Sequence, residues 1–317
     1  MGRKAAVSHT GRKRRHNEDA YVSKPPLFAI ADGMGGARAG EVASGLAAAA
    51  VKADETTGDG TERVVALIQE ANRRIYERSS EDADVSGMGT TMTVALVAGS
   101  HVTFGHVGDS RGYVLRDGAL EQLTDDHSLV AELVRGGKLS PEEAEHHPQR
   151  SVITRALGTD PDVDVDTFVV DAQPGDVFLL CSDGLTDMIS DGTIERVLAE
   201  HADDLEGALQ ELVRLANKAG GEDNITVVAF DVTDDGGEPD ERTVEQTRPM
   251  PAVSDGDVAP DPRVEEIPAV DTMVVPAEEV AQLRARSRPR RDASIWPLVW
   301  LLLVLVAAAV LLWVVAR

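Results

Sequence analysis

Cysteine is almost absent from this chain of 317 residues, and Cys181 is its single example. One cysteine excludes an intramolecular disulfide, and the scarcity of thiols favours a reducing compartment. Cys181 lies within the apolar run V-F-L-L-C-S. This position favours a buried small side chain over the alternative, a reactive nucleophile.

Basic residues are also in short supply. The chain has 31 Lys and Arg against 55 Asp and Glu, and its formal net charge is −24. A protein whose main partner is nucleic acid needs the opposite balance, so we expect no nucleic-acid partner. The acidic excess favours a solvated surface or one that binds cations. The length suits one large domain or two ordinary ones.

An apolar segment of the signal-peptide kind is missing from the first residues, M-G-R-K-A-A-V-S-H-T, whereas residues 295–316 contain no charge at all. The latter run is long enough to cross a bilayer as one helix, with Trp296, Trp300 and Trp313 at the interfaces. Five arginines precede it and Arg317 follows it. The positive-inside rule therefore predicts a single-pass plasma-membrane protein whose body is cytoplasmic. A buried core helix, the alternative, would need other elements around it.

Residues 233–294 have the composition of an acidic, proline-rich disordered linker with an arginine-rich end. Between residues 234 and 279 the linker has 14 acidic side chains against 3 arginines. Such a segment has too little apolar surface to offset the entropy of ordering, and self-repulsion would extend it. Its hydroxyl side chains are either polar spacers, which the composition favours, or modification sites: Thr243, Thr247, Ser254 and Thr272.

The body, residues 5–232, alternates strand-like runs with a few helices. Alanine-rich residues 41–51 predict one helix, and a second is expected to begin near Thr61 as N-cap, with one apolar face made by Val64, Ile68, Ala71 and Ile75. Four apolar runs follow, separated by G-S, G-D-S and D-G turns, which predicts an antiparallel meander.

The second half of the body begins with residues 124–158, which are polar and helix-prone. Two late strands, D-V-F-L-L-C-S and I-T-V-V-A-F-D, enclose helical stretches at 193–200 and 204–219. Strands in runs and helices in pairs favour an α+β fold built in layers over a doubly wound parallel sheet.

Four aspartates stand beside the strand-like runs: Asp32, Asp109, Asp183 and Asp223. If the runs pack in sheets, their ends can converge at one edge. Carboxylates gathered there would repel one another unless hard divalent cations neutralised them. The pattern therefore predicts a site for Mg²⁺ or Mn²⁺.

Eight motifs follow one another along the body: R-R-H-N-E-D at 14–19, A-D-G-M-G-G at 31–36, G-M-G-T-T at 87–91, V-G-D-S-R-G-Y at 107–113, L-T-D-D-H-S at 123–128, T-R-A-L-G at 154–158, C-S-D-G-L-T-D at 181–187 and G-G-E-D-N-I-T-V at 220–227. In this order they resemble a bacterial PPM-type (type 2C) metal-dependent Ser/Thr protein phosphatase. The resemblance implies a four-layer α-β-β-α sandwich with two central antiparallel sheets over residues 5–232.

The resemblance further implies hydrolysis of phosphoserine and phosphothreonine by a water activated between two Mn²⁺ or Mg²⁺ ions. Phosphorylated proteins, among them Ser/Thr kinases and their substrates, would be the partners. In such a protein Asp32 bridges the metals, the carbonyl of Gly33 is a ligand, and Asp183 with Asp223 completes the first metal site. The resemblance also implies that Glu18 and Asp19 hold metal-bound water and that Asp109 with Asp183 forms a third, weaker metal site.

Arg14 falls where the resemblance implies a phosphate-gripping arginine, because a guanidinium can meet two phosphate oxygens at once. The alternative is a plain basic run with Arg12, Lys13 and Arg15. Met34 stands where many eukaryotic members have a histidine, and a thioether cannot donate a proton. The general acid stays unassigned between a metal-bound water and a histidine such as His16.

Three other features are less specific. Asp126 and His127 are expected to form a hydrogen-bonded pair behind the site, and Asn224 to orient a ligand or cap a turn. The stretch from Arg135 to Arg150 resembles a mobile flap that tunes substrate choice, with four polar side chains near its end: His146, His147, Gln149 and Arg150. The resemblance favours an enzyme that opposes Ser/Thr protein kinases. Two alternatives stay open: a phosphoprotein-binding adaptor without turnover, and a phosphatase that acts in a sigma-factor pathway.

Overall fold

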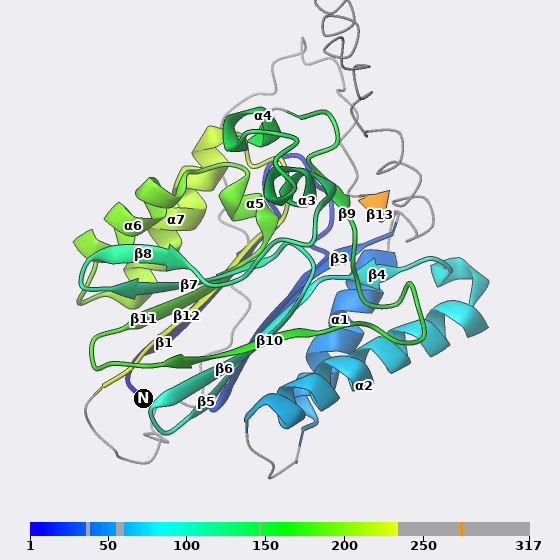
Figure 1. The fold of residues 1–317 in the computed structure, drawn as a ribbon, viewed down its shortest axis with the longest axis horizontal. Coiled ribbons are helices and arrows are strands. Elements are labelled where there is room, and N and C mark those ends of the chain that lie inside the picture. Colours follow the sequence, from blue (N-terminus) through cyan, green and yellow to red (C-terminus); the bar gives the residue numbers. More distant parts are fainter. Residues whose placement is uncertain (36–38, 55–59, 146, 234–272, 275–317) are drawn as a thin grey trace, which may run out of the picture. The chain divides into compact units, whose positions relative to one another are not determined.

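Two antiparallel sheets lie at the centre of the protein (Figure 1). The computed structural model describes residues 1–35, 39–54, 60–145, 147–233 and 273–274. The first sheet has the order β1 (Lys4–His9), β12 (Ile225–Asp231), β11 (Val177–Cys181), β7 (Arg111–Arg116) and β8 (Ala119–Gln122). The second has the order β10 (Asp166–Asp171), β6 (His101–Val107), β5 (Met92–Ala98), β3 (Leu27–Met34) and β2 (Asp19–Lys24), with β4 (Gly89–Thr90) paired to β3.

A pair of helices covers the outer face of each sheet (Figure 1). The second sheet carries α1 (Ala39–Lys52) and α2 (Gly60–Glu81), and the first carries α6 (Asp191–Glu200) and α7 (Leu205–Ala219). Shorter elements are a 3-10 helix (Ala83–Val85), α3 (Leu129–Arg135), α4 (Pro141–Glu145) and α5 (Asp183–Thr186). A separate two-stranded parallel sheet joins β9 (Val152–Ile153) to β13 (Met273–Val274).

Three apolar cores separate the four layers. In β3, Phe28 and Ile30 point between the sheets, whereas Ala29 and Ala31 point toward the helices. Strand β12 alternates in the same way, with Phe230 stacked on Phe28 at a ring-centroid distance of 4.2 Å. Because both faces are covered, these strands read as nearly continuous apolar runs in the sequence. The α-β-β-α order is therefore present in the described residues.

Both predicted helices of the first half are confirmed, and the four apolar residues of the second are fully buried on α2: Val64, Ile68, Ala71 and Ile75. The N-cap assignment is wrong, since α2 begins at Gly60 and Thr61 lies inside it. Cys181 is buried, as expected.

The predicted meander is wrong. Strands β5 and β6 pair, as do β7 and β8, but β6 and β7 belong to different sheets. The G-D-S turn between them therefore crosses from one sheet to the other. Strand β10 was not predicted, although it forms one edge of the second sheet.

The expected linker and membrane helix lie outside the described residues, except for Thr233 and Met273–Val274. Within the described ranges, no helix combines the length and the apolar character that a membrane crossing needs.

Candidate metal centre

The predicted aspartates come together from both sheets. Asp19 on β2 lies directly opposite Asp32 on β3 in the antiparallel register. Asp109 lies in the turn that connects β6 to β7, Asp183 begins α5 just after β11, and Asp223 precedes β12. The convergence expected from the strand ends is therefore observed.

Burial and mutual repulsion shape the electrostatics of this group. The pKa of Asp32 is raised well above its ordinary value, first by burial and then by the charges of Asp19, Asp183, Asp223 and Asp109. The ionised form of a carboxylate is unfavourable when four other carboxylates lie nearby, unless a positive charge neutralises the group. Protonation relieves the repulsion, and a divalent cation would relieve it more completely.

The neighbours of Asp32 are perturbed in the same direction. Burial raises the pKa of Asp19 to about 6, and burial together with Asp126 and Asp187 raises the pKa of Asp109 to about 7. The pKa of Asp183 is also raised, by burial and then by Asp109. Such shifts are typical of functional sites.

Two carboxylate oxygens of the group provide an independent sign of cation binding. Oδ1 of Asp19 and Oδ1 of Asp183 are buried and have no hydrogen-bond partner in the described structure. Buried polar atoms are nearly always satisfied, and oxygen ligands are what Mg²⁺ and Mn²⁺ prefer. The donor set therefore fits hard divalent cations. Within the described ranges, no three acidic, histidine or cysteine side chains form a complete ligand set by themselves.

The backbone of Asp32 is fixed by two threonines of the β4–β5 segment. Its N–H donates to Oγ1 of Thr91 at 3.0 Å, and its carbonyl accepts from Oγ1 of Thr90 at 2.8 Å. The next residue, Gly33, donates its N–H to the carbonyl of Glu18 at 3.1 Å. A Cβ on Gly33 would clash with the carbonyl oxygens of Gly40 and Glu18. The close approach of these backbone segments therefore requires a glycine at position 33.

Asn224 holds the loop that precedes β2. Its Oδ1 accepts from the N–H of Glu18 at 2.8 Å, and its Nδ2 donates to the carbonyls of Thr10 and His16 at 2.8 and 2.9 Å. The residue therefore fastens the segment from Thr10 to Glu18 beside Asp223, and its orientation of a ligand stays a prediction.

Arg14 reaches into the site from that loop. Its Nη2 lies 2.8 Å from Oδ2 of Asp223, and its side chain is 18% exposed. A guanidinium that is mostly buried against an aspartate of the cluster is not part of a solvated basic run. The contact keeps a guanidinium within reach of the carboxylates.

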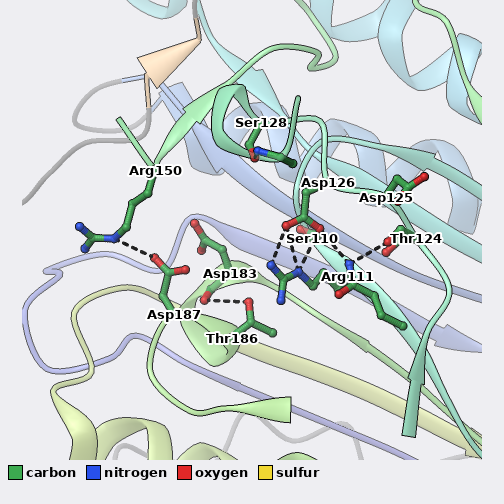
Figure 2. Close-up of polar contacts among 12 residues, drawn as sticks. Ser110, Arg111, Thr124, Asp125, Asp126, Ser128, Arg150, Asp183, Thr186 and Asp187 are labelled. Atoms are coloured by element: carbon green, nitrogen blue, oxygen red, sulfur yellow. Dashed lines mark hydrogen bonds and ion pairs between the residues drawn. The ribbon is translucent and has the colours of Figure 1, made fainter. Parts of the chain in front are cut away.

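Figure 2 shows a second aspartate on the same helical turn as Asp183, which sequence reasoning missed. Asp187 follows α5, and its Oδ2 lies 3.9 Å from Nε of Arg150. Burial raises the pKa of Asp187, and Arg150 opposes that rise. The motif contained the signal, because residues four apart on a helix share a face. Arg150 thus connects the end of the predicted flap to the carboxylate cluster.

Asp126 and His127 do not pair with each other, so that expectation is wrong. Asp126 accepts two hydrogen bonds from Arg111, from Nη2 at 2.6 Å and Nε at 2.9 Å (Figure 2). His127 instead contacts the backbone of Gly108 and the side chain of Asp166. The two neighbouring side chains therefore have separate partners.

The remaining expected features are placed as follows. Met34 packs against Ile153 and Ala156. The flap segment contains the end of α3 and all of α4. His146 lies outside the described residues.

The fold and the carboxylate cluster define a class of metal-dependent hydrolase, and comparison with known proteins identifies the family. The family described as Protein phosphatase 2C matches residues 8–226. The chain belongs to this family, the PPM-type protein serine/threonine phosphatases, and the resemblance carried by the eight motifs is confirmed.

Several relatives cover most of the body. The serine/threonine phosphatase Stp of Listeria innocua is 44% identical over 230 residues, which are 69% of this chain and 91% of that protein. PstP of Mycobacterium tuberculosis is 45% identical over 235 residues, which are 73% of this chain but only 45% of that protein. A crystal structure of the PstP catalytic domain with 2 manganese ions matches at a TM-score of 0.68 and 42% identity, covering 73% of this chain and 98% of that one. Bound manganese in that relative agrees with the expected cofactor.

Proposed function

We propose that residues 5–232 are a catalytic domain that removes phosphate from phosphoserine and phosphothreonine in proteins, among them Ser/Thr kinases and their substrates. One observation carries the proposal: five buried or partly buried aspartates of two sheets converge and leave oxygens of Asp19 and Asp183 without partners. The family membership and the manganese-bound relative support it.

In this proposal each acidic residue has a defined role in cation binding. Asp32 would be shared by two cations, the carbonyl of Gly33 would be a further ligand, and Asp183 with Asp223 would complete the first site. Glu18 and Asp19 would hold cation-bound water. Asp109 with Asp183 would form a third, weaker site. The raised pKa values of Asp32 and Asp183 are consistent with these assignments, because a cation provides the positive charge that the cluster lacks.

Two bound Mn²⁺ or Mg²⁺ ions would supply Lewis acidity, activating a water for in-line attack and neutralising charge on the phosphoryl group. The protein contributes orientation. The planar guanidinium of Arg14 binds two phosphoryl oxygens, whether or not it keeps its contact with Asp223. Asn224 keeps the Arg14 loop in place through the contacts to Thr10 and His16. Met34 cannot protonate the leaving alkoxide, so that proton comes from another group.

Phosphate release from a phosphothreonine peptide tests the proposal. The full-length chain is assayed with Mn²⁺, with Mg²⁺ and with EDTA, beside Asp183→Asn. We expect cation-dependent release that the substitution abolishes. Release that persists unchanged in EDTA would contradict the mechanism, and a folded protein without any release would support the phosphoprotein-binding adaptor instead. Phosphorylated kinases and phosphorylated anti-anti-sigma proteins, compared as substrates, separate the two signalling roles.

We further propose that residues 233–294 are a linker and residues 295–316 a membrane helix that holds the catalytic domain on the cytoplasmic side. The charge-free run and the arginines before it support this part. Membrane fractionation compares the full chain with a variant that ends at residue 294. The full chain should sediment with membranes, and the shortened chain should be released with its phosphatase activity intact. Equal partitioning of the two chains would contradict the tether.

A further inference from the structure

The turn that carries Asp109 has a demanding backbone. Gly108 adopts a φ of 112°, a conformation that side chains rarely tolerate. A Cβ at this position would also collide with Thr91. Because the turn passes from one sheet to the other, neither sheet alone fixes it. The direction of the Asp109 carboxylate therefore depends on what holds Gly108.

His127 holds both polar groups of Gly108. Its backbone N–H donates to the carbonyl of Gly108 at 2.7 Å, and its ring Nδ1 lies 3.0 Å from the N–H of Gly108. The His127 ring is buried, with a side-chain exposure of 5%. Water therefore does not easily replace the ring contact. A single residue thus clamps the peptide groups on either side of the strained glycine.

The contact with Gly108 fixes the tautomer of the ring. A backbone N–H can only donate, so Nδ1 must accept and the proton of the neutral ring lies on Nε2. Nε2 then donates to Oδ2 of Asp166 at 3.1 Å, while Arg155 binds the other carboxylate oxygen of Asp166. Asp166 and Arg155 therefore orient the ring from behind, as an outer carboxylate orients a metal-bound histidine.

A second contact fixes the other end of the turn. Oγ of Ser110 lies 2.8 Å from Oγ1 of Thr91, which already accepts the N–H of Asp32. Oγ1 of Thr93 donates to the carbonyl of Ser110 at 3.1 Å. The Asp109 turn is thus connected to Asp32 through Thr91 and to the segment after β8 through His127.

We propose that His127 is a positioning residue that fixes the Asp109 carboxylate for cation binding by clamping Gly108. This inference rests on the proposed function, in which Asp109 is a cation ligand. Within the ring, Nδ1 makes the contact to Gly108 and Nε2 does not, so the two nitrogens of His127 have different roles. That difference distinguishes a positioning role from a general structural one.

Two amide substitutions separate the nitrogens. In His127→Asn the amide oxygen can take the place of Nδ1 and still accept from Gly108. In His127→Gln the amide reaches toward the place of Nε2 and the Gly108 N–H loses its acceptor. The substitutions are similar in polarity, so each controls for the other.

Manganese binding to the full-length chain, followed by calorimetry and by electron paramagnetic resonance of free Mn²⁺, tests the inference. Asp109→Ala defines the binding that depends on Asp109. We expect His127→Gln to weaken that component by about 10-fold to 100-fold, as outer-shell changes do, and His127→Asn to stay within about threefold of the parent. Equal weakening in both variants, or no weakening in His127→Gln, would overturn the inference. Circular dichroism checks that each variant is folded.

Asp166→Ala provides a second test should His127→Gln not fold, since the Asp166 side chain is 48% exposed and tolerates change. It should weaken the same component, and an unchanged isotherm would overturn the inference. If Asp109→Ala itself leaves manganese binding intact, the ligand role of Asp109 fails and the clamp fails with it. If Asp109→Ala removes a component that His127→Gln keeps, only the clamp fails.

Discussion

Nη2 of Arg14 lies 2.8 Å from Oδ2 of Asp223, so the arginine proposed to bind phosphate is held by an aspartate proposed to bind a cation. The two residues come from opposite ends of the body, 209 positions apart. A cation on Asp223 would compete with the guanidinium for the same carboxylate. Cation binding would thereby weaken this contact and favour one between the guanidinium and a phosphoryl group.

Replacement of Arg14 by alanine should mainly raise KM for a phosphothreonine peptide, by about 10-fold, because the guanidinium contributes to binding of the ground-state phosphate. The decrease in kcat should be smaller. Steady-state kinetics with saturating Mn²⁺ measures both constants.

Arg14→Lys is the matched control, since it keeps the charge and loses the planar fork. Its KM should lie between those of the parent and Arg14→Ala. An unchanged KM in Arg14→Ala would remove Arg14 from the substrate site.

Asp183→Asn should have opposite effects on activity and on stability without metal. The substitution removes one of the buried charges that repel each other, so unfolding in EDTA should become less favourable by about 1 kcal/mol or more. The Mn²⁺-dependent rate should fall by several orders of magnitude. Urea unfolding and phosphate release measure the two effects, and a folded variant with a near-normal rate would refute the ligand role.

Gly33→Ala should be strongly destabilising, since the new methyl group would meet the carbonyl oxygens of Gly40 and Glu18. Backbone atoms cannot rotate away, so we expect a loss of about 1–3 kcal/mol in unfolding free energy and weaker Mn²⁺ binding. Gly45→Ala is the control, because space around Gly45 in α1 is open. This helical position should gain up to about 1 kcal/mol, and equal effects at both glycines would contradict the argument.

His106 should make the protein less stable in acid. Burial, followed by the charge of His127, lowers its pKa from 6.5 to about 3, although Asp166 opposes the shift. As the pH falls below 6.5, His106 of the unfolded chain takes up a proton, whereas His106 of the folded chain stays neutral, so the free energy of unfolding decreases. The difference in bound protons approaches one, which corresponds to a decrease of about 1.4 kcal/mol per pH unit.

Urea unfolding of the parent and of His106→Asn, in EDTA between pH 4.5 and 7.5, measures this contribution. Nδ2 of the asparagine can retain the bond to Oγ1 of Thr93 that Nδ1 of His106 makes at 2.9 Å, since Oγ1 gives its own proton to Ser110. The carboxylate contributions are shared by both proteins, so the difference in slope belongs to His106. Parallel pH profiles would show that the histidine does not stay neutral in the folded protein.

The aspartates were predictable because each stands beside an apolar run, and apolar runs buried on two faces must pack in layers. Which sheet each strand joins was not predictable. Gly108 allows a left-handed turn, but a hairpin and a crossing between sheets both use such a turn. The sequence spacing of β6 and β7 therefore suggested a meander that the packing does not adopt.

Other failures have local causes. Strand β10 is an edge strand with Val169 51% exposed and an aspartate at each end, so its apolar run is short. Asp126 and His127 are neighbours in sequence and were expected to pair, whereas Asp126 binds Arg111 and His127 binds Gly108 and Asp166. Asp187 was overlooked within a recognised motif, whereas its helical spacing from Asp183 would have indicated it.

The carboxylates of the candidate centre are divided between the two sheets, with Asp19 and Asp32 on one and Asp183 and Asp223 beside strands of the other. A cation held by both groups would act as a cross-link across the central phenylalanine core. Its binding energy would count only while the sheets stay packed, so metal concentration and folding would be linked thermodynamically. Chelation would then loosen the sandwich as a whole, and separation of the sheets would release the ions before either sheet lost its own hydrogen bonds.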